Sequence, residues 1–300
     1  MTRRYESPEA FKQALEARVR RVARDSSLDM GRLRQILVFD RFLARVFEEL
    51  QDRVVLKGGV VLEFRLERAR TTRDVDLRVT GDPDRLLESL QSAGRRDLAD
   101  YLSFLVVPDA EHPTIEGDAM VYDGRRFRGE ARLAGNIYGM PFGIDAGFGD
   151  VLTSDPDIIN GTTFLEFIDV KPAKFRVYPR EAHVAEKLHA YTLPRPRENS
   201  RVKDLPDLAL LGQTGAFEAE SLRHAVQTTF AFRKTHTIPA RIPSPPTSWG
   251  PIYSRMAKED ALPWSSIDAL ERVVRGFLDP LLGNAGGTWD PKNWTWSSMT

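Results

Sequence analysis

The sequence contains no cysteine among its 300 residues, which excludes disulfide bonds, thiolate zinc sites and cysteine nucleophiles together. It also has no apolar segment of signal-peptide length near the start and no apolar run long enough to span a membrane. Neither sign of charge prevails, because 43 Lys and Arg residues balance 43 Asp and Glu residues. This balance argues against a histone-like, non-specific nucleic-acid binder but leaves room for a local basic groove. We therefore expect a cytoplasmic enzyme without a membrane partner.

The composition is that of an ordinary globular protein, with 41% hydrophobic and 29% charged residues. A chain of this length can form one large or two modest domains, each with a real core. Helical periodicity marks the first 50 residues and returns from residue 180 onward, and strand patterns predominate in the section between residues 102 and 178. The pattern predicts an α+β protein with N-terminal helices in residues 1–180 and a mainly helical domain in residues 181–300.

A pair of glycines separates a short predicted strand, residues 54–56, from a predicted helix that begins near Val60. Gly58 and Gly59 leave backbone N–H groups unobstructed by Cβ atoms near a helix N-terminus, where an anionic phosphate is favoured. Because glycine is common in turns of every kind, this pair alone is weak evidence. The strand that follows adds the stronger evidence, and with it we predict that Lys57, Gly58 and Gly59 bind a nucleotide.

That second strand carries two carboxylates at alternate positions. Asp74 and Asp76 project to one face of a strand, while Val75 and Leu77 project to the other face and can be buried. Two carboxylates side by side repel each other unless a positive charge lies between them. Oxygen ligands favour a hard divalent cation, so we predict Mg²⁺ at Asp74 and Asp76, with Mn²⁺ as an alternative.

The ordered combination of these two motifs resembles a known family. The stretch LKGGVVLEFRLERARTTRDVDL is similar to the motif of AbiEii/AbiGii-type, MenT-like nucleotidyltransferase toxins of the polymerase-β-like superfamily. The resemblance continues in FGIDAGFGDV (142–151), HVAEKLHA (183–190) and RVKDLPDLALL (201–211). The wider superfamily usually has Gly-Ser where this chain has Gly58-Gly59, so no serine hydroxyl can contact phosphate there.

The resemblance implies a fold, a reaction and partners. The fold would be a polymerase-β-like nucleotidyltransferase domain with a mixed sheet, joined by a C-terminal domain that contributes to the nucleotide cleft. The reaction would transfer NMP from an NTP with Mg²⁺ to the 3′ end of tRNA, which blocks translation, and an AbiEi-like antitoxin would neutralise the toxin. The alternatives are a protein or small-molecule hydroxyl as acceptor, or a catalytically idle binding module of the same fold.

A third carboxylate is needed by sites of the polymerase-β type. Asp145 is our candidate, because it ends a predicted apolar strand that would place it beside Asp74 and Asp76. In that position it would bind metal and accept the proton of the acceptor hydroxyl. The alternative is a simple turn residue before Gly147.

Family motifs also single out Lys187, Asp204 and Asp207. Lys187 lies in a predicted helix and would neutralise the β- and γ-phosphates as charge develops on the leaving group. Asp204 and Asp207 are three residues apart, so on a helix they share a face and one of them would orient Lys187 or contact the nucleotide. The alternatives are a solvated lysine and acidic residues favoured by a helix dipole.

Two further features lie near the motifs and near the end of the chain. We predict that the Thr72 hydroxyl contacts phosphate, and that its phosphorylation would repel NTP; a plain β-branched strand residue is the alternative. We expect Trp289, Trp294 and Trp296 to dock the C-terminal tail onto the core rather than to stack on bases.

Overall fold

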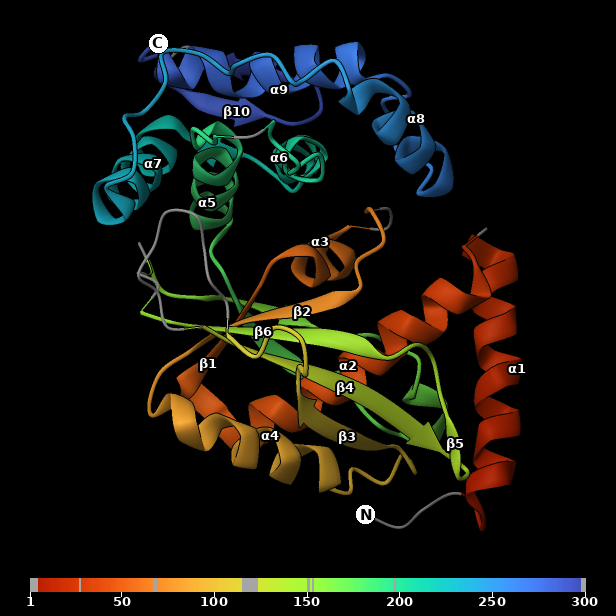
Figure 1. Ribbon diagram of the computed structural model, residues 1–300. Coiled ribbons are helices and arrows are strands. Elements are labelled where there is room, and N and C mark those ends of the chain that lie inside the picture. The colour runs from red at the N-terminus through yellow and green to blue at the C-terminus, as the bar shows by residue number, and fades with distance from the viewer. Residues whose placement is uncertain are drawn as a thin grey trace.

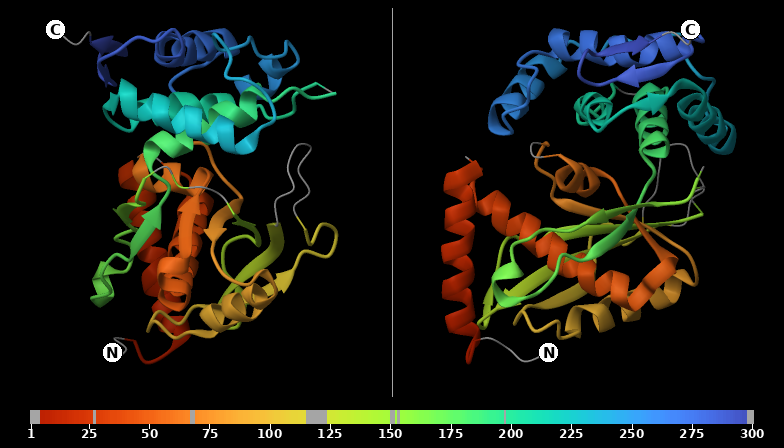
Figure 2. Two further views of the ribbon diagram at one scale, coloured as in Figure 1. Left: turned by 90° about the vertical axis from the view of Figure 1, so that its left-hand side faces the viewer. Right: turned by 180° about the vertical axis from the view of Figure 1, so that it is seen from behind.

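The computed structural model describes residues 5–26, 28–66, 69–114, 124–149, 152, 154–196 and 198–297. Figure 1 shows two tiers, a sheet with helices on both sides and a helical layer above it. The views in Figure 2 show the same separation from the side and from behind. The helices of the lower tier are α1 (Pro8–Ser26), α2 (Met30–Leu50), α3 (Gly59–Arg65) and α4 (Leu86–Arg95).

The first two helices each begin at a side chain that caps the helix. The hydroxyl of Ser7 accepts a hydrogen bond from the backbone N–H of Ala10 at 3.1 Å, as expected for a capping serine. The carboxylate of Asp29 likewise accepts from the N–H of Arg32 at 3.0 Å and caps α2. In Figure 1, α4 lies under the sheet, α2 crosses behind the strands, and α3 lies above them, facing the upper tier.

The main sheet is mixed, with the strand order β3-β4-β6-β2-β1-β8-β7 and β5 paired with β4. β2 runs parallel to β6 and β1 runs parallel to β8, whereas the other pairs are antiparallel. This architecture confirms the predicted fold class. The strands are β1 (Val54–Lys57), β2 (Asp74–Val79), β3 (Ser103–Pro108), β4 (Gly124–Leu133), β5 (Asn136–Ile137), β6 (Phe142–Phe148), β7 (Asp157–Asn160) and β8 (Lys174–Val177).

The sequence pattern predicts a helix over residues 84–101 and a strand over residues 162–170, and the structure corrects both. Residues 162–170 form no strand: the N–H of Thr162 donates to the buried carboxylate of Asp40 at 2.7 Å, and a single 3₁₀ turn follows at Glu166–Ile168. The helix expected over residues 84–101 ends at Arg95. Beyond it, Asp100 turns inward to bind Arg41 Nε at 2.7 Å and Arg45 Nη2 at 2.5 Å.

The upper tier is mainly helical, as predicted, and has its own buried core. Leu62 and Ala69 of the lower tier belong to that core, so the two tiers share an apolar contact. The division into residues 1–180 and 181–300 stays a prediction. The elements are α5 (Arg180–Thr192), α6 (Asp204–Gln213), α7 (Ala219–Arg233), α8 (Trp249–Glu259), α9 (Ile267–Leu282), β9 (Phe217–Glu218), β10 (Thr288–Asp290) and β11 (Thr295–Ser297).

Tryptophans dock the hairpin of β10 and β11 onto this core. Each of the three indole N–H groups donates to a helical carbonyl at 2.8 Å: Trp289 to Gly212, Trp294 to Val273 and Trp296 to Phe277. The expected docking is confirmed, and the hairpin supports α6 and α9. None of the helices in the described part of the chain combines the length and apolar character needed to cross a membrane.

The buried Asp40 predicts a measurable pH dependence of stability. Burial raises the pKa of its carboxyl to about 6, even though Arg41 and the N–H of Thr162 oppose that shift. The folded state holds this proton more tightly than the unfolded chain does. Protonated Asp40 therefore stabilises the fold fully below about pH 4, and this contribution is lost as pH rises through 6.

Asp40→Asn keeps an acceptor for Thr162 and removes the ionisation. The unfolding free energy of the variant minus that of the wild type should rise by about 2 to 3 kcal/mol between pH 4 and pH 7.5. Urea unfolding of both proteins across that range measures the shift. A difference that does not change with pH would contradict the assignment.

Candidate active site

The glycine turn after β1 is shaped around a carboxylate. Gly58 has a φ of +71°, and a Cβ built on it would lie 1.9 Å from Oδ2 of Asp76. In the antiparallel register of β1 and β2, Lys57 is directly opposite Asp76. The turn therefore needs glycine in order to admit the Asp76 side chain. Contact of Lys57, Gly58 and Gly59 with phosphate stays a prediction.

The three predicted metal carboxylates lie on neighbouring strands. In the parallel register of β2 and β6, Asp76 is opposite Asp145, and Asp74 is opposite Gly143. A Cβ on Gly143 would lie 2.4 Å from Oδ1 of Asp74, so this strand too leaves room for a carboxylate. Asp145 stands in the middle of β6 and not at its end, which corrects the sequence-based expectation.

The electrostatics of Asp76 fit a cation beside it. Burial raises the pKa of its carboxyl to about 6, with further contributions from Asp145 and Asp74, while Lys57 and Lys187 act in the opposite direction. Oxygen donors of this kind suit a hard divalent ion. Within the residues that the structure describes, however, no three His, Asp or Glu side chains gather closely enough to hold a metal. Binding of a metal ion by Asp74, Asp76 and Asp145 stays a prediction.

Asp145 is held by an arginine that sequence reasoning did not find. Arg126, opposite it in the antiparallel register of β4 and β6, donates from Nε to Oδ1 at 2.7 Å and from Nη2 to Oδ2 at 2.8 Å. Hydrogen bonding to this carboxylate raises the pKa of the guanidinium. Because both carboxylate oxygens are engaged, a metal ion at Asp145 would have to compete with Arg126.

Arg126→Gln is therefore expected to tighten divalent-cation binding by about tenfold, the equivalent of about 1.4 kcal/mol for one lost competing charge. Titration of the purified protein with Mn²⁺, followed by the electron paramagnetic resonance signal of the free ion, measures this affinity. Arg125→Gln is the matched control, because Arg125 is the preceding residue of β4, projects to the opposite face and binds Asp84 at 3.3 Å. Unchanged or weaker binding in Arg126→Gln would remove Asp145 from the metal ligands.

A buried ion-pair network lies in the upper tier, where α5 meets α6. Nζ of Lys187 is 3.0 Å from Oδ1 of Asp204 and 2.8 Å from Oδ2 of Asp207. Burial alone would lower the pKa of Lys187, but the two carboxylates outweigh it and raise that pKa above its ordinary value. The sequence-based prediction that the two acids share a helical face is confirmed, and Lys187 stays charged.

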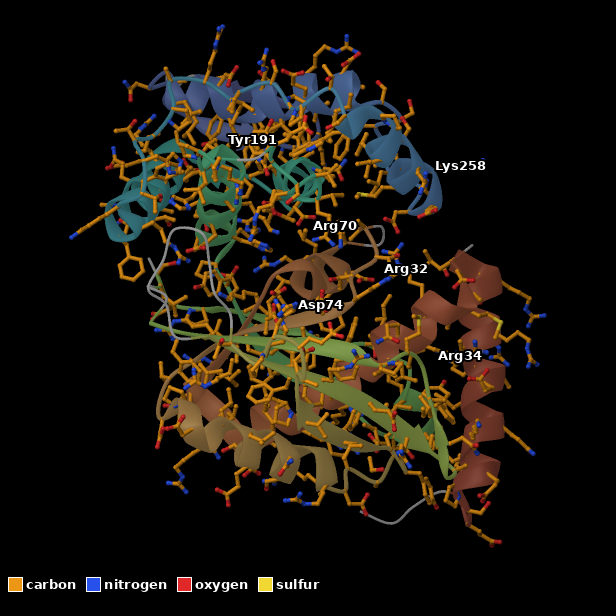
Figure 3. All side chains as sticks on the ribbon, viewed as in Figure 1. Arg32, Arg34, Arg70, Asp74, Tyr191 and Lys258 are labelled. Carbon is orange, nitrogen blue, oxygen red and sulfur yellow. The ribbon has the colours of Figure 1, made fainter. Side chains whose placement is uncertain are left out.

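Arg70, in the segment between α3 and β2, is the second site residue that the sequence analysis did not predict. Nε and Nη2 of Arg70 bind Oδ1 and Oδ2 of Asp207 at 2.7 and 2.8 Å. Burial would raise the pKa of Asp207, but Arg70 and Lys187 outweigh it and hold that pKa well below its usual range. Figure 3 shows Arg70 above Asp74, toward the upper tier. The sequence offers no signal for this contact except an arginine two residues before Thr72.

Thr72 is closed to solvent, with 6% of its surface exposed. Its N–H donates to Oε1 of Glu63 at 2.9 Å, and its hydroxyl would lie 2.9 Å from a Cβ placed on Gly59. The phosphate contact and the phosphorylation predicted for Thr72 stay predictions.

Comparisons with known proteins point to one family. The family model described as "Nucleotidyl transferase AbiEii toxin, Type IV TA system" matches residues 41–274. No curated protein matches the sequence of this chain. Among solved structures, MenT4, a nucleotidyltransferase toxin from Mycobacterium tuberculosis H37Rv, is 15% identical with a TM-score of 0.56, and the match covers 92% of each chain. A putative nucleotidyltransferase from Helicobacter pylori is 15% identical with a TM-score of 0.43, over 82% of this chain and 97% of that one.

Proposed function

Because the chain belongs to the AbiEii nucleotidyltransferase toxin family of type IV toxin–antitoxin systems, we propose that it adds a nucleotide to the 3′ end of tRNA with the help of Mg²⁺. Family membership makes the chain a nucleotidyltransferase, with an NTP as substrate and an antitoxin as partner. Addition at the 3′ end would block aminoacylation and hence translation. An AbiEi-like protein is the antitoxin that we expect.

One observation carries the proposed chemistry. Two lysines stand on the Asp76 side of the site: Lys57 is opposite Asp76 in the register of β1 and β2, and the charges of Lys57 and Lys187 both oppose the rise that burial causes in the pKa of Asp76. A triphosphate between Asp76 and Lys187 would have its α-phosphate near the carboxylates and its outer phosphates near Lys187. When bound, Mg²⁺ would supply the Lewis acidity that stabilises the attacking and leaving oxygens.

Side chains of the protein assist the transfer step itself. The acceptor hydroxyl oxygen attacks the α-phosphorus while the bond from that phosphorus to the β-bridging oxygen breaks, and pyrophosphate leaves. Lys187 offsets the negative charge that develops on the leaving group. The proton of the acceptor hydroxyl passes to a carboxylate, and Asp145 can take it once Arg126 releases one of its oxygens. Asp204 and Asp207 hold the lysine in place.

The experiment incubates the purified protein with Mg²⁺, each α-³²P-labelled NTP in turn, and total bacterial RNA. Two controls accompany it: the Asp74→Ala variant, and RNA whose 3′-terminal diol has been oxidised with periodate. Label in RNA of tRNA size, lost with either control, supports the proposal. Label that resists periodate oxidation, or that appears in protein or a small molecule, would reject the 3′ end of tRNA as acceptor. No transfer to any acceptor would reject the proposed function.

A further inference from the structure

Arg70 joins the two tiers of the molecule at the candidate site. By sequence it belongs to the segment that leads into Asp74, yet its guanidinium forms a two-bond ion pair with Asp207 of α6, at 2.7 and 2.8 Å. The residue is 6% exposed, so this pair is formed out of water. A forked pair of this kind fixes direction as well as distance.

The same guanidinium also lies beside the glycine turn. A Cβ placed on Gly59 would meet Nη2 of Arg70 at 3.3 Å. Oδ2 of Asp207 accepts from Nη2 of Arg70 at 2.8 Å and lies 2.8 Å from Nζ of Lys187. Arg70 thus stands between the turn predicted to hold phosphate and the carboxylate that holds the lysine.

The balance of charge in this network depends on Arg70. Two carboxylates, Asp204 and Asp207, face three cations, because Arg201 also approaches Asp204 at 3.4 Å. Without the arginine, Oδ1 of Asp207 would lose its partner, and the buried carboxylate would turn wholly toward Lys187. Nζ of Lys187 would then be drawn toward α6 and away from Asp76.

We propose that Arg70 is a positioning residue that acts through Asp207. It sets the position of the Lys187 ammonium group and how much of the charge of that group is available to the leaving phosphates. The inference rests on the proposed function, in which Lys187 acts on the leaving phosphates. Arg70 itself takes no part in bond making. It connects the strand that carries the carboxylates to the helix that carries the acids around the lysine.

Arg70→Lys keeps the charge but cannot form the forked pair. Since Lys187 acts on charge that develops only in the transition state, kcat should fall by about 10- to 100-fold while KM for NTP changes by less than about threefold. Arg34→Lys is the matched control. Arg34 forms a similar forked pair with Glu16, at 2.9 and 2.6 Å, and lies beside α1, well away from Asp74 in Figure 3.

A purely structural ion pair would give a different result. Melting temperature would then fall in both variants, and kcat per folded molecule would stay unchanged in both. A second test places Arg70→Lys in a Lys187→Ala background. If Arg70 acts through Lys187, the double variant should be no slower than Lys187→Ala alone. Independent, multiplying losses would overturn the inference.

A readout without catalysis separates this inference from the proposed function. Competitive acetylation with acetic anhydride, read by mass spectrometry, reports the reactivity of the Lys187 amine relative to the exposed Lys258. Arg70→Gln should lower that ratio several-fold, because Asp207 then binds the lysine alone. An unchanged ratio overturns the inference even if the wild type transfers nucleotide. A lowered ratio sustains it even if the wild type transfers none.

Discussion

Asp76→Asn is expected to reduce nucleotide transfer by at least about 10³-fold, because a neutral amide cannot hold a divalent cation or stabilise it during phosphoryl transfer. Asp76 is the carboxylate that lies against Gly58 and opposite Asp145, at the centre of the proposed metal site. The amide has nearly the same shape, so the fold should survive. Because the substitution also removes a repelling charge, the melting temperature should not fall.

Initial rates with the preferred NTP and total RNA, together with thermal unfolding, measure both effects. Asp25→Asn is the control, since Asp25 is an exposed residue of α1. It should leave both the rate and the melting temperature nearly unchanged. An Asp76→Asn protein that retained a tenth of the wild-type rate would remove Asp76 from the metal ligands.

Gly58→Ala is expected to have the second largest effect. An alanine would have to adopt a φ of +71°, and its Cβ would lie 1.9 Å from the Asp76 carboxylate. With a ψ of −156° as well, this conformation is one that essentially only glycine adopts, and the backbone strain alone costs about 1–3 kcal/mol. The steric conflict must also move Asp76, so transfer should fall by about 10²-fold or more, as misplaced catalytic groups commonly do.

Gly135→Ala separates these two causes. Gly135 has nearly the same φ, +72°, but a Cβ there would meet nothing within 4 Å. Urea unfolding gives the loss of stability in each variant, and only Gly58→Ala should lose activity beyond its loss of folded protein. Equal activity in the two variants would mean that the close approach of Asp76 to the turn is unimportant for catalysis.

Much of this site could be predicted from sequence because its signals are local. The alternation in Asp74–Leu77 indicates which side chains share a face, and burial of Val75 and Leu77 confirms it. The spacing of Asp204 and Asp207 places both acids toward Lys187. The family and the enzyme class inferred from these motifs are confirmed by the match over residues 41–274.

What sequence reasoning missed depends on long-range geometry. Arg70 and Asp207 are separated by 137 positions, and Arg126 reaches Asp145 only because β4 and β6 pair in one particular register. A shift of that register by one residue would turn Arg126 to the other face of the sheet. Nothing in a single sequence fixes such a register. Asp145 lies in the middle of β6 because β2 and β4, the strands on either side, pair with β6 beyond this residue.

The tryptophan hairpin has a consequence for when the protein becomes able to act during its synthesis. Trp289 bonds to Gly212 at the end of α6, the helix that carries Asp204 and Asp207. Because a ribosome releases the chain from its N-terminus onward, the sheet with Asp74 and Asp76 can fold well before this support exists. The lysine network would become firmly seated only after residue 296 has emerged.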